Sequence, residues 1–461
     1  MNDGDQCQDE QPLLISTSDT ATRGVVGSTA TPSSNGLLIS DLPKRYTAYP
    51  PLLLLPFNFT SHSARWAKFY SGLDEADKTE LFRCIAEEGF RKMSISRVAI
   101  NAPIAAVIGH DDEDEAEEAE RCGVLSYGEQ SHHNQGKEQS KQPNVLRSPS
   151  GLVPIYGDWR PPVTPDQHKP RILHPTVQDF QQAFWTSTSQ HEGVTQVWAP
   201  LYTMFSRGNI SEKARILGIQ SRFPGLTAHE LGDGEYIGEV DVVDLYVGIG
   251  YFAFCYLKRG VRRVYGWDIN PWSIEGLRRG CERNGWRCEV VKIDQKGKIE
   301  SEGGVRGLVA RIREGDEDGR EEKVIRCVAF LGDNRLAANV IEEIQDGFKK
   351  VESKAGRKRP ELNIRHINLG LLPTSKAGWS DAVRMLNSMS NGKGGWAHIH
   401  ENVDVRDIKD KAGSIVKEVD GLLRAVSGPR FNASCAHIEQ VKTYAPGVMH
   451  CVYDIELQSN G

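Results

Sequence analysis

The stretch VDVVDLYVGIGYFAFCYLKRG, residues 240–260, decides the fold. Its first residues are apolar and β-branched, which is typical of a buried strand, and its last residues have the spacing of an amphipathic helix. Gly248 and Gly250 stand between the two segments. Glycine is needed where the backbone takes a positive φ or approaches a ligand closely, and the N-terminus of the following helix attracts negative groups. The stretch therefore predicts a strand, a tight turn and a helix that together bind a ligand.

From residue 238 onward, predicted strands and helices alternate. RRVYGWDIN predicts a strand that ends in Asp268, and PWSIEGLRRGCERNG predicts a helix with Asn270 as its N-cap and Pro271 in its first turn. CVAFLGD and WAHIHENV are later strands, and AHIEQVKTYA and MHCVYDIEL should form a terminal hairpin. Repeated strand–helix units favour an α/β, Rossmann-like fold with a mostly parallel sheet, to which the hairpin adds an antiparallel edge.

Composition divides the chain further. Residues 1–41 are rich in Ser, Thr, Gly and Asp and predict a disordered tail. We expect a smaller α+β N-terminal domain at 42–225, with a polar and acidic insertion at 109–142. Residues 226–461 should form the ligand-binding domain, with a charged insertion at 294–323.

Charge and cysteine content exclude some classes of protein. The net charge of −6 argues weakly against nucleic acid, but eight acidic residues lie within residues 110–121, and without them the remainder carries about +2. The nine cysteines include no CxxC pair, which favours reduced thiols in the cytoplasm and no metal site. The longest aliphatic run, PPLLLLPF, is too short to span a membrane.

Polar residues follow the strands that should adjoin the glycine turn. In an open α/β sheet, ligands bind at the carboxyl ends of the strands, where Asp268 and Asp333 are expected. Asp268 could accept both hydroxyls of a ribose. Asp333 could accept from an adenine amino group, and Asn334 could bind the edge of the ring. Three interpretations stay open. The site could bind S-adenosylmethionine, or it could bind a dinucleotide, although Ala253 replaces the third glycine of the GxGxxG motif. In the third interpretation, the glycines only form a turn and the aspartates only cap helices.

With these residues in hand, the chain resembles the wybutosine-synthesising aminocarboxypropyltransferases, which are related to the tRNA guanine-N1 methyltransferases. The resemblance extends over most of residues 42–457 and rests on these separated segments: VWAPLYTMFSRGNISEKARIL, VDLYVGIGYFAF, WDINPWSIEGLRRG, FLGDNR, INLGLLPTSKAGW and HIHENV. It implies the fold of the S-adenosylmethionine-dependent methyltransferases. It also implies transfer of the 3-amino-3-carboxypropyl group of S-adenosylmethionine to carbon 7 of 4-demethylwyosine, next to the anticodon of tRNA-Phe, with release of methylthioadenosine.

The resemblance also suggests how the methionine end is held. It places residues 206–213 over the cofactor, with Ser206 and Lys213 as the expected contacts. A lysine could pair with the carboxylate of the transferred group, and Arg207 and Arg215 are alternatives. A capped helix, with Asn209 and Glu212 as a capping box, is the other reading of this segment.

Asn368 stands where amino-group methylases carry an Asn-Pro-Pro-like turn. Here it is followed by Leu-Gly, which counts against ordinary base methylation. Asn368 is the candidate for a catalytic role in orienting the purine, although satisfying a turn is an equal possibility. His398, His400 and Glu401 look like metal ligands, but on a strand Glu401 points away from the two histidines, so we expect no metal.

The partner implied by the resemblance is tRNA-Phe, with no membrane and no stable protein partner. Basic segments at 278–283 and 349–360 could meet phosphates, and Trp272, Trp286 and Trp379 could stack on bases, although core packing is the usual role of tryptophan. Two alternatives remain, a tRNA guanine methyltransferase and a catalytically silent tRNA-binding scaffold.

Overall fold

The computed structural model describes residues 37–101, 152–159, 170–190, 192–206, 208–219, 221–231, 234–350, 362–390, 392–427 and 431–459. The insertion predicted at 109–142 and nearly all of the predicted tail lie outside these residues. The described residues pack into two compact units. The first holds residues up to 159 together with 181–187 and 199–204, and the second holds 170–180, 188–198 and the residues from 205 onward. Residues 205–225, which we assigned to the N-terminal domain, thus pack with the second unit.

The first unit is a four-stranded sheet with helices. Its strands are β1 (Thr47–Tyr49), β2 (Leu52–Pro56), β3 (Arg97–Asn101) and β4 (Leu152–Tyr156), in that order, and β2 and β3 are parallel. The helices α2 (Ala64–Ser71) and α3 (Glu75–Cys84) supply Trp66 and Phe82 to a core that also contains Leu53 and Leu55. This small core of sheet and helix agrees with the α+β class expected for the N-terminal part.

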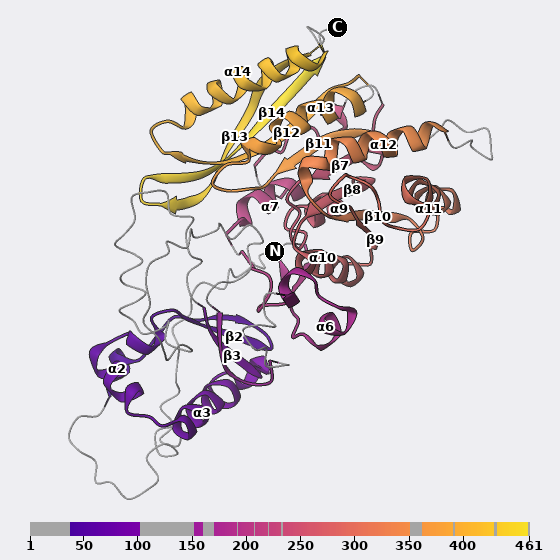
Figure 1. Ribbon diagram of the computed structural model, residues 1–461. Coiled ribbons are helices and arrows are strands. Elements are labelled where there is room, and N and C mark those ends of the chain that lie inside the picture. The colour runs from indigo at the N-terminus through magenta and orange to yellow at the C-terminus, as the bar shows by residue number, and fades with distance from the viewer. Residues whose placement is uncertain are drawn as a thin grey trace, which may run out of the picture. The chain divides into compact units, whose positions relative to one another are not determined.

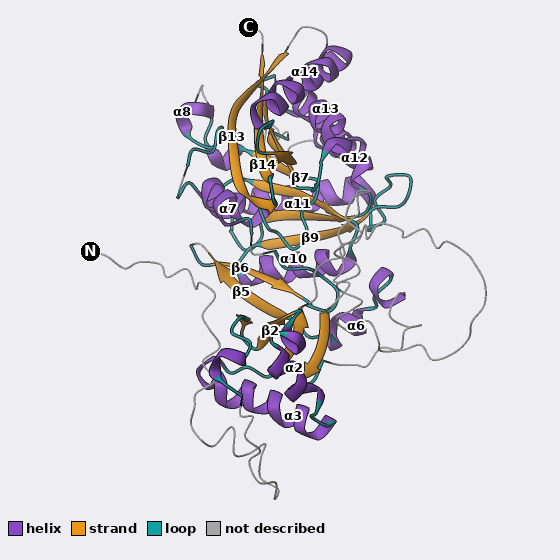
Figure 2. Ribbon diagram, turned by 90° about the vertical axis from the view of Figure 1, so that its left-hand side faces the viewer, coloured by secondary structure: helices purple, strands orange, loops and turns teal. Residues whose placement is uncertain are grey.

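The second unit is built on an eight-stranded sheet (Figures 1 and 2). In sequence its strands are β7 (Asp241–Asp244), β8 (Arg263–Asp268), β9 (Arg287–Lys292), β10 (Ile325–Leu331), β11 (Ile364–Leu369), β12 (Gly395–Asp404), β13 (Phe431–Ala445) and β14 (Val448–Ser459). Their order in the sheet is β13-β14-β12-β11-β7-β8-β10-β9. The strands from β7 to β12 pair in parallel, and β14 pairs antiparallel with β12 and β13. The parallel sheet and the terminal hairpin are confirmed.

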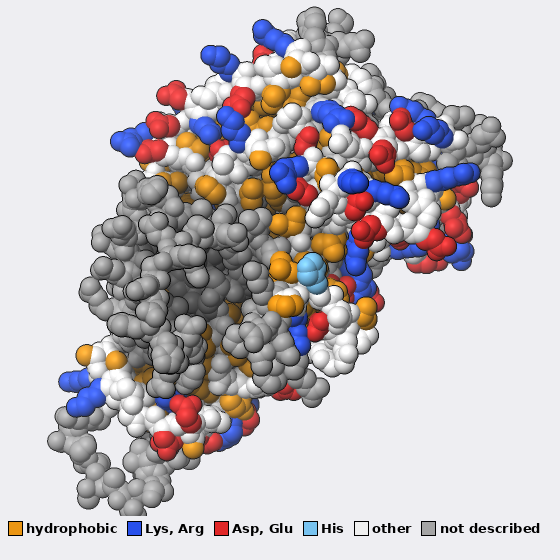
Figure 3. Space-filling model, in the orientation of Figure 1, with side chains coloured by type: hydrophobic (Ala, Val, Ile, Leu, Met, Phe, Trp, Pro, Cys, Tyr) orange, Lys and Arg blue, Asp and Glu red, His pale blue; other side chains and the backbone are white. Residues whose placement is uncertain are grey.

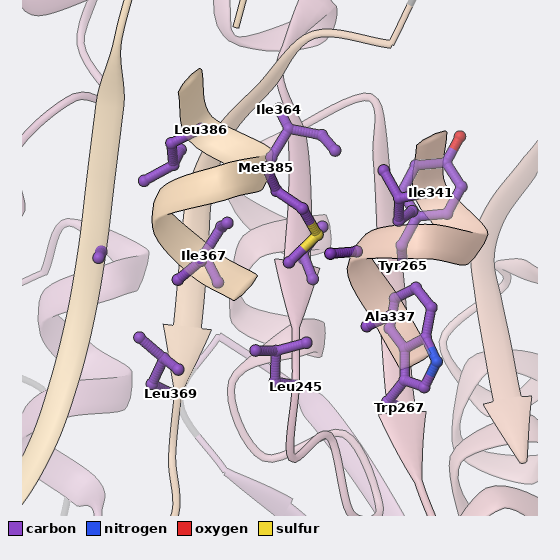
Figure 4. Packing of buried hydrophobic residues seen from close by; sticks show 14 of the residues in the cluster. Leu245, Tyr265, Trp267, Ala337, Ile341, Ile364, Ile367, Leu369, Met385 and Leu386 are labelled. Atoms are coloured by element: carbon purple, nitrogen blue, oxygen red, sulfur yellow. The ribbon is translucent and has the colours of Figure 1, made fainter. Parts of the chain in front are cut away.

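Helices cover both faces of this sheet. One core joins the sheet to α11 (Gly304–Asp318), α12 (Ala337–Lys350), α13 (Trp379–Met389) and α14 (Ile408–Ser427). The other joins it to α7 (Ile210–Leu217), α9 (Ala253–Arg259) and α10 (Pro271–Arg283). Val242 belongs to one core and Val243 to the other, because successive side chains of a strand point to opposite faces. Figure 4 shows Leu245, Trp267 and Ile367 in the first core. The shorter elements are β5 (Thr186–Gln190), β6 (Val194–Trp198), α6 (Val177–Gln182) and α8 (Ala228–Leu231).

The stretch 294–323 differs from the prediction of a charged insertion. It contains α11, and Leu308, Val309 and Ile312 are fully buried in the main core. These apolar residues are spaced by one and three positions, which places them on one face of a helix. The many charged residues between them occupy the other face, and they hid this periodicity in the sequence.

A buried ion network ties α7 to the terminal hairpin. The Arg215 guanidinium donates to the Glu212 carboxylate at 2.8 and 2.9 Å and to Asp454 of β14 at 2.5 and 3.2 Å. His398 Nδ1 lies within hydrogen-bond distance of Asp454 Oδ1, at 2.7 Å, and His398 Nε2 lies 3.0 Å from His366 Nδ1. All these side chains are buried. Arg215 was one alternative for binding the methionine carboxylate, and this network already occupies its guanidinium.

Arg215→Met should strongly destabilise the second unit. The variant keeps an apolar stem but leaves the buried Glu212 and Asp454 carboxylates without their cation, which costs about 3–5 kcal/mol. Arg222→Met is the matched control, because the Arg222 side chain is 71% exposed in its ion pair with Glu230, and such pairs contribute about 0–1 kcal/mol. Urea unfolding of the two variants measures the difference. Equal losses of stability would contradict a structural role for the network.

Candidate functional site

The predicted glycine turn lies at the carboxyl end of β7. Gly248 has φ +54° and Gly250 has φ +90°, so both adopt the left-handed conformation that favours glycine. A Cβ atom on Gly250 would lie 2.6 Å from the ring of Phe254 and 2.9 Å from Leu277. The Gly248 amide donates to Asp268 Oδ2 at 3.0 Å. The turn therefore needs glycine for its backbone and for packing, and it is bonded to the predicted ribose-binding residue.

Asp268 ends β8 and organises the start of the next helix. Its Oδ1 accepts from the amide of Asn270 at 2.7 Å. Asn270 is the N-cap of α10, because its side chain accepts from the Trp272 amide at 2.9 Å and Pro271 follows it. The predicted cap is confirmed. The Asp268 carboxylate thus holds both the glycine turn and the start of α10 through backbone hydrogen bonds.

The strand order brings Asp333 and Asn334 to the same edge. β10, and not β9, is the neighbour of β8, and the Gly332 amide donates to the Asp268 carbonyl at 3.1 Å. Asn334 Nδ2 donates to the Leu245 carbonyl at 2.7 Å. The Asp333 carboxylate caps the following 3-10 turn (Asn334–Leu336) and is hydrogen-bonded by the Arg335 guanidinium, which lowers the pKa of Asp333. Asp268, Asp333 and the glycine turn thus meet as the sequence suggested, with Asp333 already paired to a neighbour.

Asp244 is a residue that the sequence reasoning missed. It ends β7 just before the glycine turn, and its side chain is fully buried. Oδ1 accepts from the Tyr246 amide and from Asn368 Nδ2, both at 3.2 Å, whereas Oδ2 and Asn368 Oδ1 have no hydrogen-bond partner among the described residues. Burial raises the pKa of Asp244 to about 7, although the hydrogen bonds from Asn368 and Tyr246 oppose that rise. The only sequence signal was an acid at the end of an apolar strand.

Lys213 is a buried cation on α7. Its side chain is only 2% exposed, and Nζ donates to Gln190 Oε1 at 2.9 Å and to Gln196 Oε1 at 3.0 Å. Nζ also lies 5.4 Å from the centre of the Tyr251 ring and beside a small cavity that Cys255 helps to line. Burial lowers the pKa of Lys213 to about 8. Among the described residues no carboxylate pairs with this ammonium, which is unusual for a buried charge.

The segment before α7 contacts Tyr251, the residue that follows Gly250 in the glycine turn. The Ser206 amide donates to the Tyr251 hydroxyl at 3.2 Å, and the Phe205 ring lies 6.2 Å from the Tyr251 ring. Ser206 and Lys213 therefore both lie against the residue that follows Gly250. The expected capping box is absent, since the Asn209 side chain makes no capping bond and Glu212 pairs with Arg215. Arg207 lies outside the described residues.

The histidines of β12 belong to internal pairs. His398 is part of the Asp454 network, and His400 Nδ1 lies 3.0 Å from His450 Nε2. The His400 ring is 5.1 Å from the Phe252 ring. Glu401 accepts from Thr374 at 2.7 Å and pairs with Lys411 at 2.9 Å. The three residues that looked like a ligand set thus have three separate sets of partners.

Among the residues predicted to contact phosphates and bases, the structure describes the arginines of 278–283 and the three tryptophans. Arg278 and Arg279 both bond Glu275, and Arg278 also pairs with Glu282, so two acids lie beside these two cations. Trp272 and Trp379 are buried, which contradicts a stacking role for them, and Trp286 is partly buried. Most of the segment 349–360 lies outside the described residues. On the face seen in Figure 3, basic and acidic side chains are interspersed. None of the described helices is long and apolar enough to cross a membrane.

Comparison with known proteins gives a consistent set of relatives. The tRNA wybutosine-synthesizing protein 2 of Schizosaccharomyces pombe is 33% identical over 416 residues, which cover 90% of this chain and 73% of that protein. The protein of the same name from Saccharomyces cerevisiae is 29% identical over 449 residues, covering 91% and 75%. No family model matches the chain.

The solved structures that resemble this chain are more distant in sequence. The structure of P. horikoshii TYW2 in complex with MeSAdo is 13% identical, with a TM-score of 0.45, and the match covers 95% of this chain and 97% of that one. M. jannaschii tRNA m1G37 methyltransferase is also 13% identical, with a TM-score of 0.42, covering 90% and 72%.

Asp244 should make stability depend on pH in a direction opposite to that of an ordinary paired carboxylate. Its pKa rises from 3.8 to about 7 on folding, so between these values the folded chain holds a proton that the unfolded chain has lost. The free energy of unfolding therefore falls as pH rises from about 4 to about 7 and then levels. Urea unfolding of the wild type and of Asp244→Asn isolates this contribution, because other titrations cancel in the difference. A difference that does not change with pH would contradict the raised pKa.

Proposed function

This chain belongs to the tRNA wybutosine-synthesizing protein 2 family, and we propose that it carries out the family's aminocarboxypropyl transfer. The 3-amino-3-carboxypropyl group of S-adenosylmethionine moves to carbon 7 of 4-demethylwyosine, which loses its proton, and methylthioadenosine is released. The observation that carries the proposal is the 33% identity that extends over 90% of the chain. The convergence of the glycine turn, Asp268 and Asp333 on one edge of the sheet supports it.

The adenosine end of S-adenosylmethionine is proposed to lie at this edge. Gly248 and Gly250 let the backbone approach it closely, because neither carries a Cβ atom. Asp268 accepts from the ribose hydroxyls while its backbone hydrogen bonds hold it in place. Asp333 and Asn334 bind the adenine edge. Asp333 bonds its exposed neighbour Arg335, and an exposed pair of this kind is weak enough to yield to a ligand.

The surroundings of Asp244 suit a ligand that carries a positive charge. Its Oδ2 is a buried oxygen without a hydrogen-bond partner among the described residues, next to the turn. S-adenosylmethionine carries a sulfonium and an ammonium, and a nearby positive charge stabilises an ionised carboxylate. The sulfonium makes the adjacent carbon open to attack and leaves as a neutral sulfide, so no acid is needed. We therefore assign positioning, more than acid–base chemistry, to this part of the site.

Lys213 and Ser206 are proposed to hold the methionine end. The lysine ammonium has three N–H donors, and Gln190 and Gln196 take two of them. The carboxylate of the transferred group would accept the third and provide the anion that this buried charge lacks. Ser206 lies near by through its contact with Tyr251. Such an anchor selects which of the three carbons on sulfur is held for attack.

Asn368 is proposed to orient the purine. Asp244 fixes its Nδ2, whereas its buried Oδ1 has no partner among the described residues and could accept from the base. The Leu-Gly that follows Asn368 separates this site from ordinary amino-group methylases. Guanine methylation is the alternative activity, and a catalytically silent scaffold is disfavoured because the cofactor-site residues are intact.

The substrate is proposed to be tRNA-Phe, with S-adenosylmethionine as the co-substrate and with no metal required for transfer. We also propose the cytoplasm as the compartment, and no membrane or stable protein partner. Incubation of the full-length chain with S-adenosylmethionine and tRNA-Phe that carries 4-demethylwyosine tests the activity. Methylthioadenosine as the product supports aminocarboxypropyl transfer. S-adenosylhomocysteine would instead indicate methylation, and neither product would indicate a scaffold.

Asp268→Ala should weaken S-adenosylmethionine binding. The ribose loses a charged acceptor, which costs about 1.5–3 kcal/mol, and the Gly248 amide loses the bond that fixes the turn. Calorimetric titration measures the affinity, and a melting curve shows that the variant folds. Glu282→Ala on the exposed side of α10 serves as the control. Unchanged affinity in a folded Asp268→Ala variant would refute the ribose assignment.

Lys213→Met should lower turnover severely and methylthioadenosine affinity very little. Methionine keeps a long, unbranched apolar side chain in the buried position and removes the ammonium group with its N–H donors. The reacting carbon loses its anchor, and misplacement by about 1 Å costs on the order of a hundredfold in rate. S-adenosylmethionine affinity should fall by a smaller factor. Lys258→Met on α9 is the matched exposed control.

Two outcomes of the Lys213 experiment would contradict the assignment. Equal weakening of S-adenosylmethionine and methylthioadenosine would place Lys213 at the adenosine end, because methylthioadenosine lacks the carboxylate. Unchanged turnover would leave Lys213 as a structural residue held by its two glutamines.

A further inference from the structure

Three cysteines that are distant in sequence meet in the second unit. Cys281 lies on α10, Cys288 on β9 and Cys327 on β10, and their sulfur atoms all lie within 4.8 Å of one another. Cys288 and Cys327 are partners in the parallel register of β9 and β10. All three are free thiols. The cluster could not be foreseen from the sequence, because no two of its members form a CxxC pair.

The proposed transferase site does not use this cluster. Cys288 is the second residue of β9 and Cys327 the third residue of β10, so both lie toward the amino ends of their strands. Asp268 and Asp333 follow the carboxyl ends of the neighbouring strands. A ligand on the three sulfurs would therefore occupy a separate place at the other edge of the sheet.

The spacing of the sulfurs suits one soft ion or metalloid. A centre bound to three thiolates at about 2.3 Å, the length of a zinc–sulfur bond, would hold the sulfurs about 4 Å apart in a trigonal plane and somewhat closer in a pyramid. The observed limit of 4.8 Å means that each sulfur needs to move by only a fraction of an ångström. Among the described residues the group contains no histidine or carboxylate ligand. Three sulfurs with no harder ligand favour a soft, three-coordinate centre.

The apolar surroundings decide which charge the centre carries. Cys281 and Cys327 are completely buried in the core that holds Ile274, Leu277 and Ala329. A divalent ion on three thiolates leaves a net charge of −1 and a monovalent ion leaves −2, whereas a trivalent centre leaves none. Burying a net charge in such surroundings is costly. A neutral complex of three thiolates with a trivalent, thiophilic element is thus the form that this core accommodates best.

Cys288 is the member of the cluster that an incoming ligand can reach. It is partly exposed, whereas its two partners are buried. The first bond to an incoming ligand would therefore form at Cys288.

We propose that Cys281, Cys288 and Cys327 form a binding site for trivalent arsenic. Arsenous acid, As(OH)3, reacts with the three thiols. Three As–S bonds form, three As–O bonds break, and each hydroxyl group leaves as water with one thiol proton. No electron is transferred, and the product is neutral.

The test uses the full-length, reduced protein and arsenite. Native mass spectrometry should show the gain of one arsenic with the loss of three protons, and the arsenic X-ray absorption spectrum should show three sulfur neighbours. Cys288→Ala should lower the affinity at least tenfold. Cys435→Ala, in β13, is a control outside the cluster and should bind as the wild type does. The double variant Cys7→Ala/Cys122→Ala controls in the same way for the two cysteines outside the described residues.

A second cluster variant controls for the possibility that Cys288→Ala loses affinity because it does not fold. Cys327→Val keeps an apolar side chain in the core, and it should also abolish three-sulfur binding. Arsenite should raise the melting temperature of the wild type but not of either cluster variant, because a ligand that binds only the folded state stabilises it. Equal arsenite affinity in the wild type and Cys288→Ala, or a bound arsenic with fewer than three sulfur neighbours, would overturn the proposal.

Discussion

The hydrogen bond from the Gly248 amide to the Asp268 carboxylate is the link on which the candidate site depends. It joins the turn after β7 to the end of β8. A second hydrogen bond, from the Gly332 amide to the Asp268 carbonyl, adds the end of β10. Gly250 makes the turn possible, because a Cβ atom there would collide with Phe254. Asp268 and three glycines thus bring three strand ends together.

The features that could be predicted are those that depend on residues close together in the sequence. The glycine turn, the cap at Asn270 and the terminal hairpin follow from local patterns, and the structure has them all. The environment of Lys213 could not be predicted, because Gln190 and Gln196 reach it from other elements. Asp244 was missed for the same reason, since its burial depends on packing around β7 and not on its neighbours in sequence.

Buried charges in this protein fall into two kinds that the sequence does not distinguish. Arg215 and Lys213 lie two residues apart on α7, and both were candidates for the same ligand. The Arg215 guanidinium is fully committed to Glu212 and Asp454, so it serves the fold. Lys213 has only neutral partners among the described residues. An incomplete set of partners, and not the presence of charge, is what marks a position that awaits a ligand.

The place of β14 in the sheet has a consequence for synthesis of the chain. β14 is made after every other described element, yet it lies between β13 and β12 and carries Asp454 into the core. While the ribosome is still adding these residues, Arg215 and His398 are already present without their shared anion. The nascent second unit therefore cannot complete its sheet before β14 has been synthesised. A chain that stopped before Val448 would hold Arg215 and His398 without Asp454.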